Sequence, residues 1–167
     1  MMKVLNLLVL SMVFTMSTAF TTTENKIPSI KLKTLDGQSV ELYDYIEEGK
    51  LTVISFWATW CTPCKAELDA LTDFYPDWRD DYNVELLAIT IDNARGLSKV
   101  PAEVTTKGWE FTVLSDVNSE SLTALEFQTI PQTFVVDGEG NIVYAHNGYT
   151  AGDEYELDEK LAALSSK

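Results

Sequence analysis

The chain has 167 residues and is strongly acidic, with 12 Lys and Arg against 26 Asp and Glu and a formal net charge of −14. This length suits one domain with its own hydrophobic core, and we expect a monomer. The charge excludes binding that depends on attraction to nucleic acid or to an anionic membrane surface. Two cysteines, Cys61 and Cys64, allow one intrachain disulfide.

The first 19 residues predict an export signal. Residues 4–14 are largely apolar, and residues 17–19 are small, as signal peptidase requires. Because the apolar run is shorter than the roughly 20 residues that span a bilayer, a cleaved signal is favoured over an uncleaved anchor. We therefore expect an exported protein, periplasmic or otherwise extracytoplasmic, either soluble or tethered by its N-terminus. Its predicted parts are a signal at 1–19, a flexible leader at 20–29 and a folded domain at 30–167.

The first half of the domain predicts a hairpin and a β-to-α unit. Residues 30–35 and 39–42 alternate like strands around a turn at Asp36-Gly37. Residues 51–57 form a continuous apolar run that suits a strand covered on both faces. A helix over 64–77 follows, since apolar residues recur there at helical spacing, and a second buried strand is expected at 84–91.

The second half continues the alternation and ends in a hairpin. We expect a helix over 93–107 that Pro101 interrupts, a strand at 111–114, a helix at 119–127, paired strands at 133–136 and 141–145, and an amphipathic helix at 154–164. Strands that alternate with helices predict an α/β fold, with a central mixed sheet flanked by helices on both faces.

The cysteines lie in Trp60-Cys61-Thr62-Pro63-Cys64, where the first buried strand gives way to a helix. A disulfide here closes so small a loop that it restricts the unfolded chain little, which favours a redox role over a structural one. Half of a zinc site, which would need further ligands, and an inert disulfide are the alternatives. The first turn of a helix favours a thiolate, so Cys61 is the expected nucleophile and Cys64 the resolving thiol.

The stretch from Phe56 to Lys65 resembles the active-site segment of the thioredoxin superfamily, and further motifs are similar to those of exported TlpA/ResA-type proteins. These motifs are Leu35-Asp36-Gly37, Gly49-Lys50, Lys107-Gly108-Trp109, residues 130–137 and Gly140. The resemblance implies a thioredoxin-like fold with an N-terminal β-hairpin extension, and an extracytoplasmic thiol–disulfide reductase. Several such proteins keep the cysteines of apocytochrome c reduced. The implied partners are a disulfide-bearing exported protein and a membrane thiol-electron donor, with no cofactor besides the Cys61–Cys64 disulfide.

The residues between the cysteines indicate the redox direction. Strongly oxidising relatives carry a His in this gap, whereas this chain has Thr62 and Pro63. A reductant is therefore expected, with a potential nearer thioredoxin's, about −270 mV, than that of a strong oxidant, about −120 mV. A peroxiredoxin-type peroxidase is disfavoured, because Pro and Thr do not stand at the usual spacing ahead of Cys61.

Proton transfer in this chain needs a different group from the one that thioredoxin uses. The position of thioredoxin's buried Asp is occupied by Ser55, which cannot act as a base near neutral pH. Glu67 follows Cys64 by three residues, on the same helical face, and matches the acid beside the cysteines of ResA-type proteins. Glu67 is our candidate proton acceptor for Cys64, and an exposed glutamate of no consequence is the alternative.

Pro131 is the second landmark that the resemblance supplies. In the superfamily a cis proline here packs against the cysteines, and the residue before it offers its main chain to an extended substrate. The predicted substrate-binding residues are therefore Trp60, Thr62, Pro63, Thr129, Ile130 and Pro131. Asp69 stands where many relatives have a kinking proline, so the active-site helix is expected to be straighter.

Two other classes of function are weighed against catalysis. Relatives that hold Cu(I) use cysteines with Met or His, but Met1, Met2, Met12 and Met16 all lie in the predicted signal and leave His146 as the soft-metal candidate. No metal site is predicted. A binding module that seldom uses its thiols would need neither the cysteine pair nor Pro131.

Overall fold

The structure is a computed structural model that describes residues 25–165. The expected signal at 1–19 and the first half of the expected leader lie outside the described residues. None of the helices within 25–165 is long and apolar enough to cross a membrane.

Seven strands of the described residues form one mixed sheet, with the order β2-β1-β5-β4-β3-β6-β7. The strands are β1 (Lys31–Thr34), β2 (Ser39–Glu41), β3 (Leu51–Trp57), β4 (Val84–Thr90), β5 (Thr112–Ser115), β6 (Gln132–Val136) and β7 (Ile142–Asn147). Neighbours β3, β4 and β5 run parallel, and the other pairs are antiparallel. The predicted N-terminal hairpin is confirmed, and it extends the main sheet because β1 pairs with β5.

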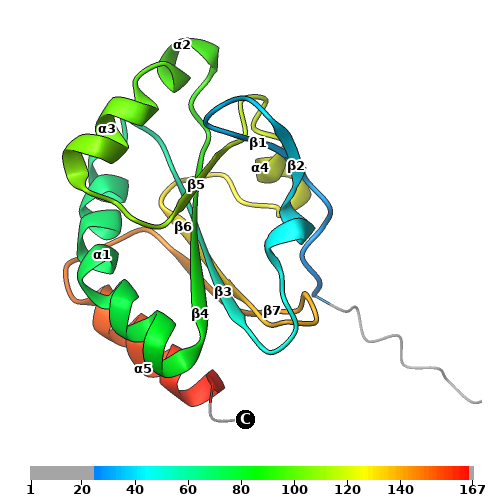
Figure 1. Ribbon diagram of the computed structural model, residues 1–167, viewed down its shortest axis with the longest axis vertical. Helices are drawn as coiled ribbons and strands as arrows, with labels where there is room; N and C mark the ends of the chain where they lie inside the picture. The colour runs from blue at the N-terminus through cyan, green and yellow to red at the C-terminus, as the bar shows by residue number, and fades with distance from the viewer. Residues whose placement is uncertain (1–24, 166–167) are drawn as a thin grey trace, which may run out of the picture.

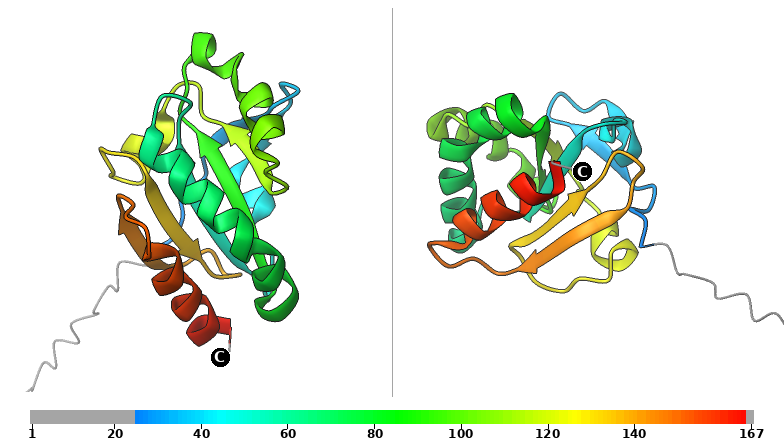
Figure 2. Two further views of the ribbon diagram at one scale, coloured as in Figure 1. Left: turned by 90° about the vertical axis from the view of Figure 1, so that its left-hand side faces the viewer. Right: turned by 90° about the horizontal axis from the view of Figure 1, so that it is seen from below.

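Helices cover both faces, as the strand and helix pattern predicts. The helices are η1 (Leu42–Tyr45), α1 (Thr62–Tyr82), α2 (Ala94–Leu97), α3 (Val100–Lys107), α4 (Glu120–Ala124) and α5 (Asp153–Ser165). Helices α1, α3 and α5 pack on one face, while the short η1 and α4 lie on the other (Figures 1 and 2). The thioredoxin-like arrangement expected from the sequence is confirmed.

The central strands are mostly apolar because each one faces two cores. In β3, Val53 and Trp57 belong to the core beneath α1 and α5, whereas Ile54 and Phe56 belong to the core on the opposite face. Side chains that alternate between two buried faces leave few polar positions in a strand. Thr52 and Ser55 are the polar residues of β3, and Ser55 faces α1.

Two boundaries differ from the sequence-based expectation. The leader prediction is wrong for residues 25–29, because Ile27 is buried and its N–H donates to the carbonyl oxygen of Gly140 at 2.8 Å. The helix expected over 93–107 is interrupted before Val100, not at Pro101. A proline fits the first turn of a helix, where its missing N–H has no intrahelical partner to lose.

Helix α1 is longer than predicted and runs without a break through both Asp69 and Pro76. It ends at Tyr82, where Asn83 takes a left-handed conformation and donates its N–H to the carbonyl of Trp78. The buried side chains of Leu68, Leu71 and Trp78 anchor this helix along its length. Packing against the sheet thus outweighs the local preference of Pro76 to interrupt a helix.

Candidate active site

The Cys61–Cys64 disulfide lies at the N-terminus of α1, beyond the carboxyl end of β3. Cys61 caps the helix, since its Sγ accepts a hydrogen bond from the Cys64 N–H at 3.2 Å. Pro63 occupies the first turn, and the first turn carries no acidic side chain. The unpaired N–H groups of this helix end are therefore directed at a sulfur, which favours the thiolate form when the disulfide is reduced.

The two sulfurs differ in their access to solvent. Cys64 is completely buried, and Cys61 is 5% exposed. Trp60 beside Cys61 is 68% exposed, and Thr62 and Pro63 are exposed as well. A protein substrate can approach the pair only from the side of Cys61, which fits the predicted order of attack by the two thiols.

A buried carboxylate, Asp92, fixes the loop that precedes Cys61. Its two oxygens accept the N–H of Thr59 at 2.7 Å and the hydroxyl of Thr59 at 2.8 Å. The hydroxyl of Thr90 donates to the same carboxylate at 2.7 Å, and a Cβ at Gly96 would collide with it. Sequence reasoning missed this residue, although its place just after β4, next to the carboxyl end of β3, was a usable signal.

The predicted substrate ledge lies beside the disulfide. The Ile130–Pro131 peptide bond is cis, as expected, and the carbonyl oxygen of Ile130 lies 3.9 Å from the Sγ of Cys61. Thr129 is exposed, Ile130 is half-buried and Pro131 is buried. The structure thus brings the ledge and the more accessible sulfur together.

Asn147 at the end of β7 holds this ledge in place, and sequence reasoning missed it. Its Nδ2 donates to the carbonyl oxygen of Thr129 at 3.2 Å and to the Oε1 of Gln132 at 2.9 Å. Its Oδ1 accepts the hydroxyl of Thr129 at 3.0 Å. The next residue, Gly148, donates its N–H to the carbonyl oxygen of Pro131 at 2.8 Å. These bonds tie the ledge to β7 on both sides of Ile130.

Glu67 is buried behind the cysteine pair, so the alternative of an exposed glutamate is wrong. Its side chain has an exposed fraction of 4%. One oxygen accepts the hydroxyl of Ser55 and the other accepts the hydroxyl of Thr133, each at 2.7 Å. Ser55 and Thr133 lie directly opposite each other in β3 and β6, so the two strands present a matched pair of donors.

Burial raises the pKa of the Glu67 carboxyl above its ordinary value of 4.5, and the hydroxyl groups of Ser55 and Thr133 oppose this shift only in part. A carboxylate with a raised pKa is a better proton acceptor near neutral pH than an ordinary surface glutamate. Ser55, which cannot act as a base, instead helps to hold the acid that α1 supplies.

The described residues give no sign of a metal centre. Within 25–165, His, Cys, Asp and Glu side chains do not gather in any group of three that could hold a metal ion. His146, the soft-metal candidate, lies in β7, and its Nε2 is 3.2 Å from the Oδ2 of Asp153.

Comparison with known proteins places this geometry in a family. The model of the AhpC/TSA family matches residues 23–145. The chain belongs to the AhpC/TSA family. The thiol–disulfide oxidoreductase ResA of Bacillus subtilis is 31% identical over 123 residues, which cover 72% of this chain and 65% of that protein. ResA of Bacillus thuringiensis subsp. konkukian is 26% identical over 149 residues, which cover 86% of this chain and 83% of the relative.

Solved structures agree with this placement. A thioredoxin-like protein from Porphyromonas gingivalis matches with 40% identity and a TM-score of 0.75, over 86% of this chain and 94% of its own. StoA from Bacillus subtilis matches at 22% identity and a TM-score of 0.62, over 80% of this chain and 97% of its own, and supports the fold alone. The predicted ResA-type resemblance is confirmed, and the Cys61–Cys64 pair places the chain among thiol–disulfide oxidoreductases.

Proposed function

We propose that this protein reduces disulfides in exported proteins, with Cys61 as nucleophile, Cys64 as resolving thiol and Glu67 as proton acceptor. The observation that carries the proposal is the order of groups across the site. The ledge at Ile130 faces the more accessible Cys61, Cys64 is buried behind it, and a buried carboxyl with a raised pKa lies three residues further along α1.

The reaction takes two exchanges. The Cys61 thiolate attacks one sulfur of the substrate disulfide, and the other substrate sulfur leaves as a thiolate that takes a proton from water. The Cys64 thiol then passes its proton to Glu67 and attacks the Cys61 sulfur, which releases the second substrate thiolate. This thiolate also takes a proton from water, and Glu67 returns the proton of Cys64 to the solvent. The substrate gains two electrons and two protons, and the Cys61–Cys64 disulfide forms. A membrane thiol donor would return the pair to its reduced state.

The proposed substrate is a protein segment that can lie extended along the ledge. Such a segment would pair with the main chain at Ile130 as an added strand, while exposed Trp60, Thr62 and Pro63 contact its side chains. An apocytochrome c whose cysteines await haem attachment is one substrate of this class. This choice rests on the resemblance to exported ResA-type proteins.

Trapping the mixed disulfide tests the proposal. A Cys64→Ser variant lacks the resolving thiol, so we expect it to stay covalently joined through Cys61 to its substrate, whose identity mass spectrometry would give. A Cys61→Ser variant is the matched control and should capture no partner through that sulfur. Recovery of no partner from the exported fraction, together with rapid turnover of hydrogen peroxide, would replace the reductase with a peroxidase.

The redox potential tests the direction separately. Equilibration of the wild-type protein with glutathione buffers should give a midpoint near that of thioredoxin, about −270 mV. A midpoint close to about −120 mV would make the protein an oxidant and would reject the reductase proposal.

A further inference from the structure

A small cavity lies against Glu67 and connects it to groups outside the cysteine site. Its volume of about 10 Å³ gives room for about one water molecule. The titratable side chains in its wall are Glu67 itself, Tyr144 and His146 from β7, Tyr149 from the following loop, and Asp153 and Glu154 from α5. The buried carboxyl therefore borders the same small cavity as side chains from the edge strand and the last helix.

His146 is placed to act on Glu67 through this space. It lies directly opposite Thr133 in the β6–β7 ladder, and side chains of opposed residues project from the same face of a sheet. Thr133 is the residue whose hydroxyl donates to Glu67. The His146–Asp153 pair, with each side chain 31% exposed, also reaches solvent, whereas Glu67 does not.

The other titratable side chains in the cavity wall cannot act on Glu67 in this way. Burial, followed by the nearby Glu156 or Glu154 carboxylate, raises the pKa of Tyr144 and of Tyr149 to about 12, so both hydroxyls keep their protons near neutral pH. Glu154 is occupied by the Tyr149 hydroxyl and the Gly152 N–H, each at 2.9 Å. His146 is the one basic side chain among the six wall groups, and histidine in general changes charge near neutral pH.

We propose that His146, paired with Asp153, is a positioning residue that controls the ionisation of Glu67 across the cavity, so that Glu67 becomes a carboxylate most readily when His146 carries its proton. The catalytic meaning of this control rests on the proposed role of Glu67 as proton acceptor. The control itself is a property of the folded protein and can be measured without turnover.

The sign of the coupling follows from the charges. A protonated His146 favours the Glu67 carboxylate, and the Asp153 carboxylate disfavours it, in accord with the smaller contributions of these two groups to the pKa of Glu67. Coupling between two proton sites is reciprocal, so ionised Glu67 must favour the protonated form of His146 to the same extent. The histidine therefore reports the charge of the buried carboxyl.

The chain has a single histidine, which makes the measurement direct. The ring Cε1–H signal of His146 would be followed by NMR against pH in the oxidised protein, where the cysteines do not titrate. In the wild type we expect the signal to respond to the ionisation of Glu67 as well as to that of the ring, as in coupled pairs. In Glu67→Gln the titration should become a single step, lower by about half a pH unit or more, a roughly threefold loss of proton affinity.

Glu47→Gln is the matched control, since it removes one carboxylate ahead of β3, at the opposite end of that seven-residue strand from the cysteines. Its histidine titration should follow the wild type, which separates a local effect from the change in net charge. Superimposable titrations of the wild type and Glu67→Gln would overturn the proposal. If Glu67→Gln fails to fold, the infrared carboxyl stretch of protonated Glu67 measures its ionisation directly. This band would be followed against pH in the wild type, His146→Gln and His146→Lys. Loss of the band at a higher pH in His146→Gln than in the other two proteins would support the coupling, and identical curves would overturn it.

Kinetics separate this inference from the proposed function. The pH-dependent limb of mixed-disulfide resolution should move to higher pH in His146→Gln and stay near the wild type in His146→Lys, which keeps a cation. In one outcome, the histidine titration shifts in Glu67→Gln while the mixed disulfide resolves at the wild-type rate in both Glu67→Gln and His146→Gln. This result would support the coupling and reject Glu67 as the proton acceptor. An unshifted titration with slow resolution in Glu67→Gln would reject the coupling and support the acceptor.

Discussion

Glu67 owes its position to two hydroxyl groups on neighbouring strands, and its chemistry to the fact that no cation within residues 25–165 pairs directly with its oxygens. Ser55 and Thr133 hold the carboxyl by hydrogen bonds but add no charge. The desolvation cost of ionisation is therefore left largely uncompensated, and the pKa is raised. Two neutral donors therefore hold the carboxyl in place without keeping it permanently ionised. A proton acceptor needs this property, because it must be able to take up a proton.

The first prediction concerns the step that Glu67 would serve. Glu67→Gln should slow resolution of the mixed disulfide by about 100-fold, within the range for loss of a general base, and leave the initial attack by Cys61 unchanged. Rapid mixing of the reduced variant with a disulfide peptide, with the two released thiols followed separately, measures both steps. Equal rates for variant and wild type from about pH 6 to about pH 9 would remove Glu67 from the mechanism.

The second prediction concerns Asp92, which touches neither sulfur. Asp92→Asn replaces one carboxylate oxygen by an NH2 group, which cannot accept the hydrogen bond that Thr59 or Thr90 donates in the wild type. We therefore expect a loss of about 2 kcal/mol in the free energy of unfolding. The loop before Cys61 should loosen and alter the rate at which reduced Cys61 reacts with iodoacetamide. Urea unfolding and alkylation rates measure the two effects.

Asp116→Asn provides the matched control for Asp92→Asn. Asp116 is just as buried, but it accepts the N–H groups of Glu120 and Ser121 at the start of α4. This substitution should lower stability to a similar extent and leave Cys61 alkylation unchanged. If both variants alter alkylation equally, Asp92 acts through general stability and not on the loop.

At the scale of elements, the end of β7 serves as a support for the docking ledge, and Asn147 is its main contact. The third prediction is that Asn147→Ala raises KM for a disulfide-containing peptide several-fold with little change in kcat, because the ledge must be ordered again when the peptide binds. A small aromatic disulfide that does not use the ledge should react at the normal rate. Asn141→Ala, which alters the other end of the same hairpin, is the control. A fall in kcat with unchanged KM would show that the ledge positions the reacting sulfur instead.

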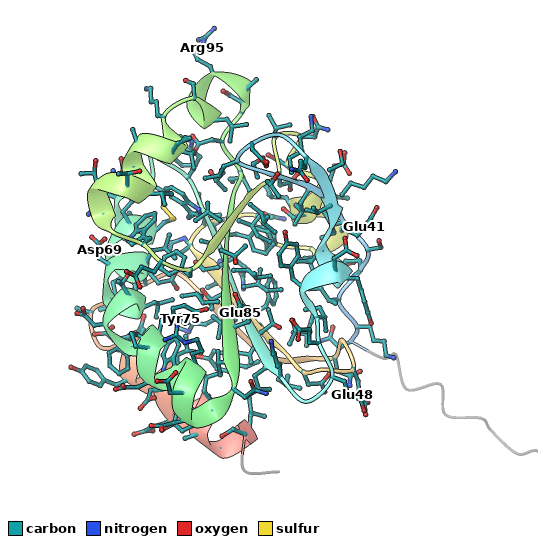
Figure 3. The ribbon with its side chains drawn as sticks, in the orientation of Figure 1. Glu41, Glu48, Asp69, Tyr75, Glu85 and Arg95 are labelled. Carbon is teal, nitrogen blue, oxygen red and sulfur yellow. A yellow bond between two sulfur atoms is a disulfide. The ribbon has the colours of Figure 1, made fainter. Side chains whose placement is uncertain are left out.

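Element types and their order could be predicted because they follow from local pattern. The buried run of β3, the helical spacing in α1 and the Asp-Gly turns depend on near neighbours in the chain. Asp69 shows where this reasoning ends. From the sequence, Asp69 was noted only because many relatives have a proline at its position. In the structure its oxygens accept the indole N–H of Trp109 at 3.0 Å and a hydrogen bond from the Lys107 ammonium at 2.5 Å. These bonds join α1, where Asp69 lies (Figure 3), to the end of α3.

The same limit separates the site residues that were predicted from those that were missed. Cys61, Cys64 and Glu67 share one helix, so their spacing showed that they belong together. Asp92 bonds the loop before that helix from beyond the end of β4, Asn147 bonds the ledge from the end of β7, and His146 lies opposite Thr133 in the β6–β7 ladder. Their parts depend on strand order and register, which pairwise spacing along the chain does not contain.

At the scale of the whole molecule, the raised pKa of Glu67 ties the site to stability. The folded protein holds a proton at Glu67 that the unfolded chain loses once the pH exceeds the ordinary value of 4.5. Between that pH and the raised folded-state pKa, the folded state binds more protons, so the free energy of unfolding falls as pH rises. Above the folded-state pKa the cost is complete and constant.

The fourth prediction follows from this sign. Glu67→Gln removes the ionisation, so the variant should gain stability relative to the wild type as the pH rises above 4.5, and the difference should level off once Glu67 is ionised in the folded state. Urea unfolding of both oxidised proteins over a pH series measures the difference, in which the titrations of distant carboxyls cancel. A difference that stays constant with pH would mean that Glu67 ionises as freely in the fold as in the unfolded chain.

Glu154→Gln should show the opposite sign and serves as an internal standard. Burial alone would raise the pKa of Glu154, but its own N–H, that of Gly152 and the Tyr149 hydroxyl outweigh burial and lower it. Glu154 therefore stabilises the wild type above pH 4.5, and that contribution is lost as the pH falls through the lowered pKa. The variant should be less stable than the wild type near neutral pH and approach it in acid. Two glutamates that line one cavity would then shift stability in opposite directions, as expected if the fold keeps one ionised and holds the other ready to accept a proton.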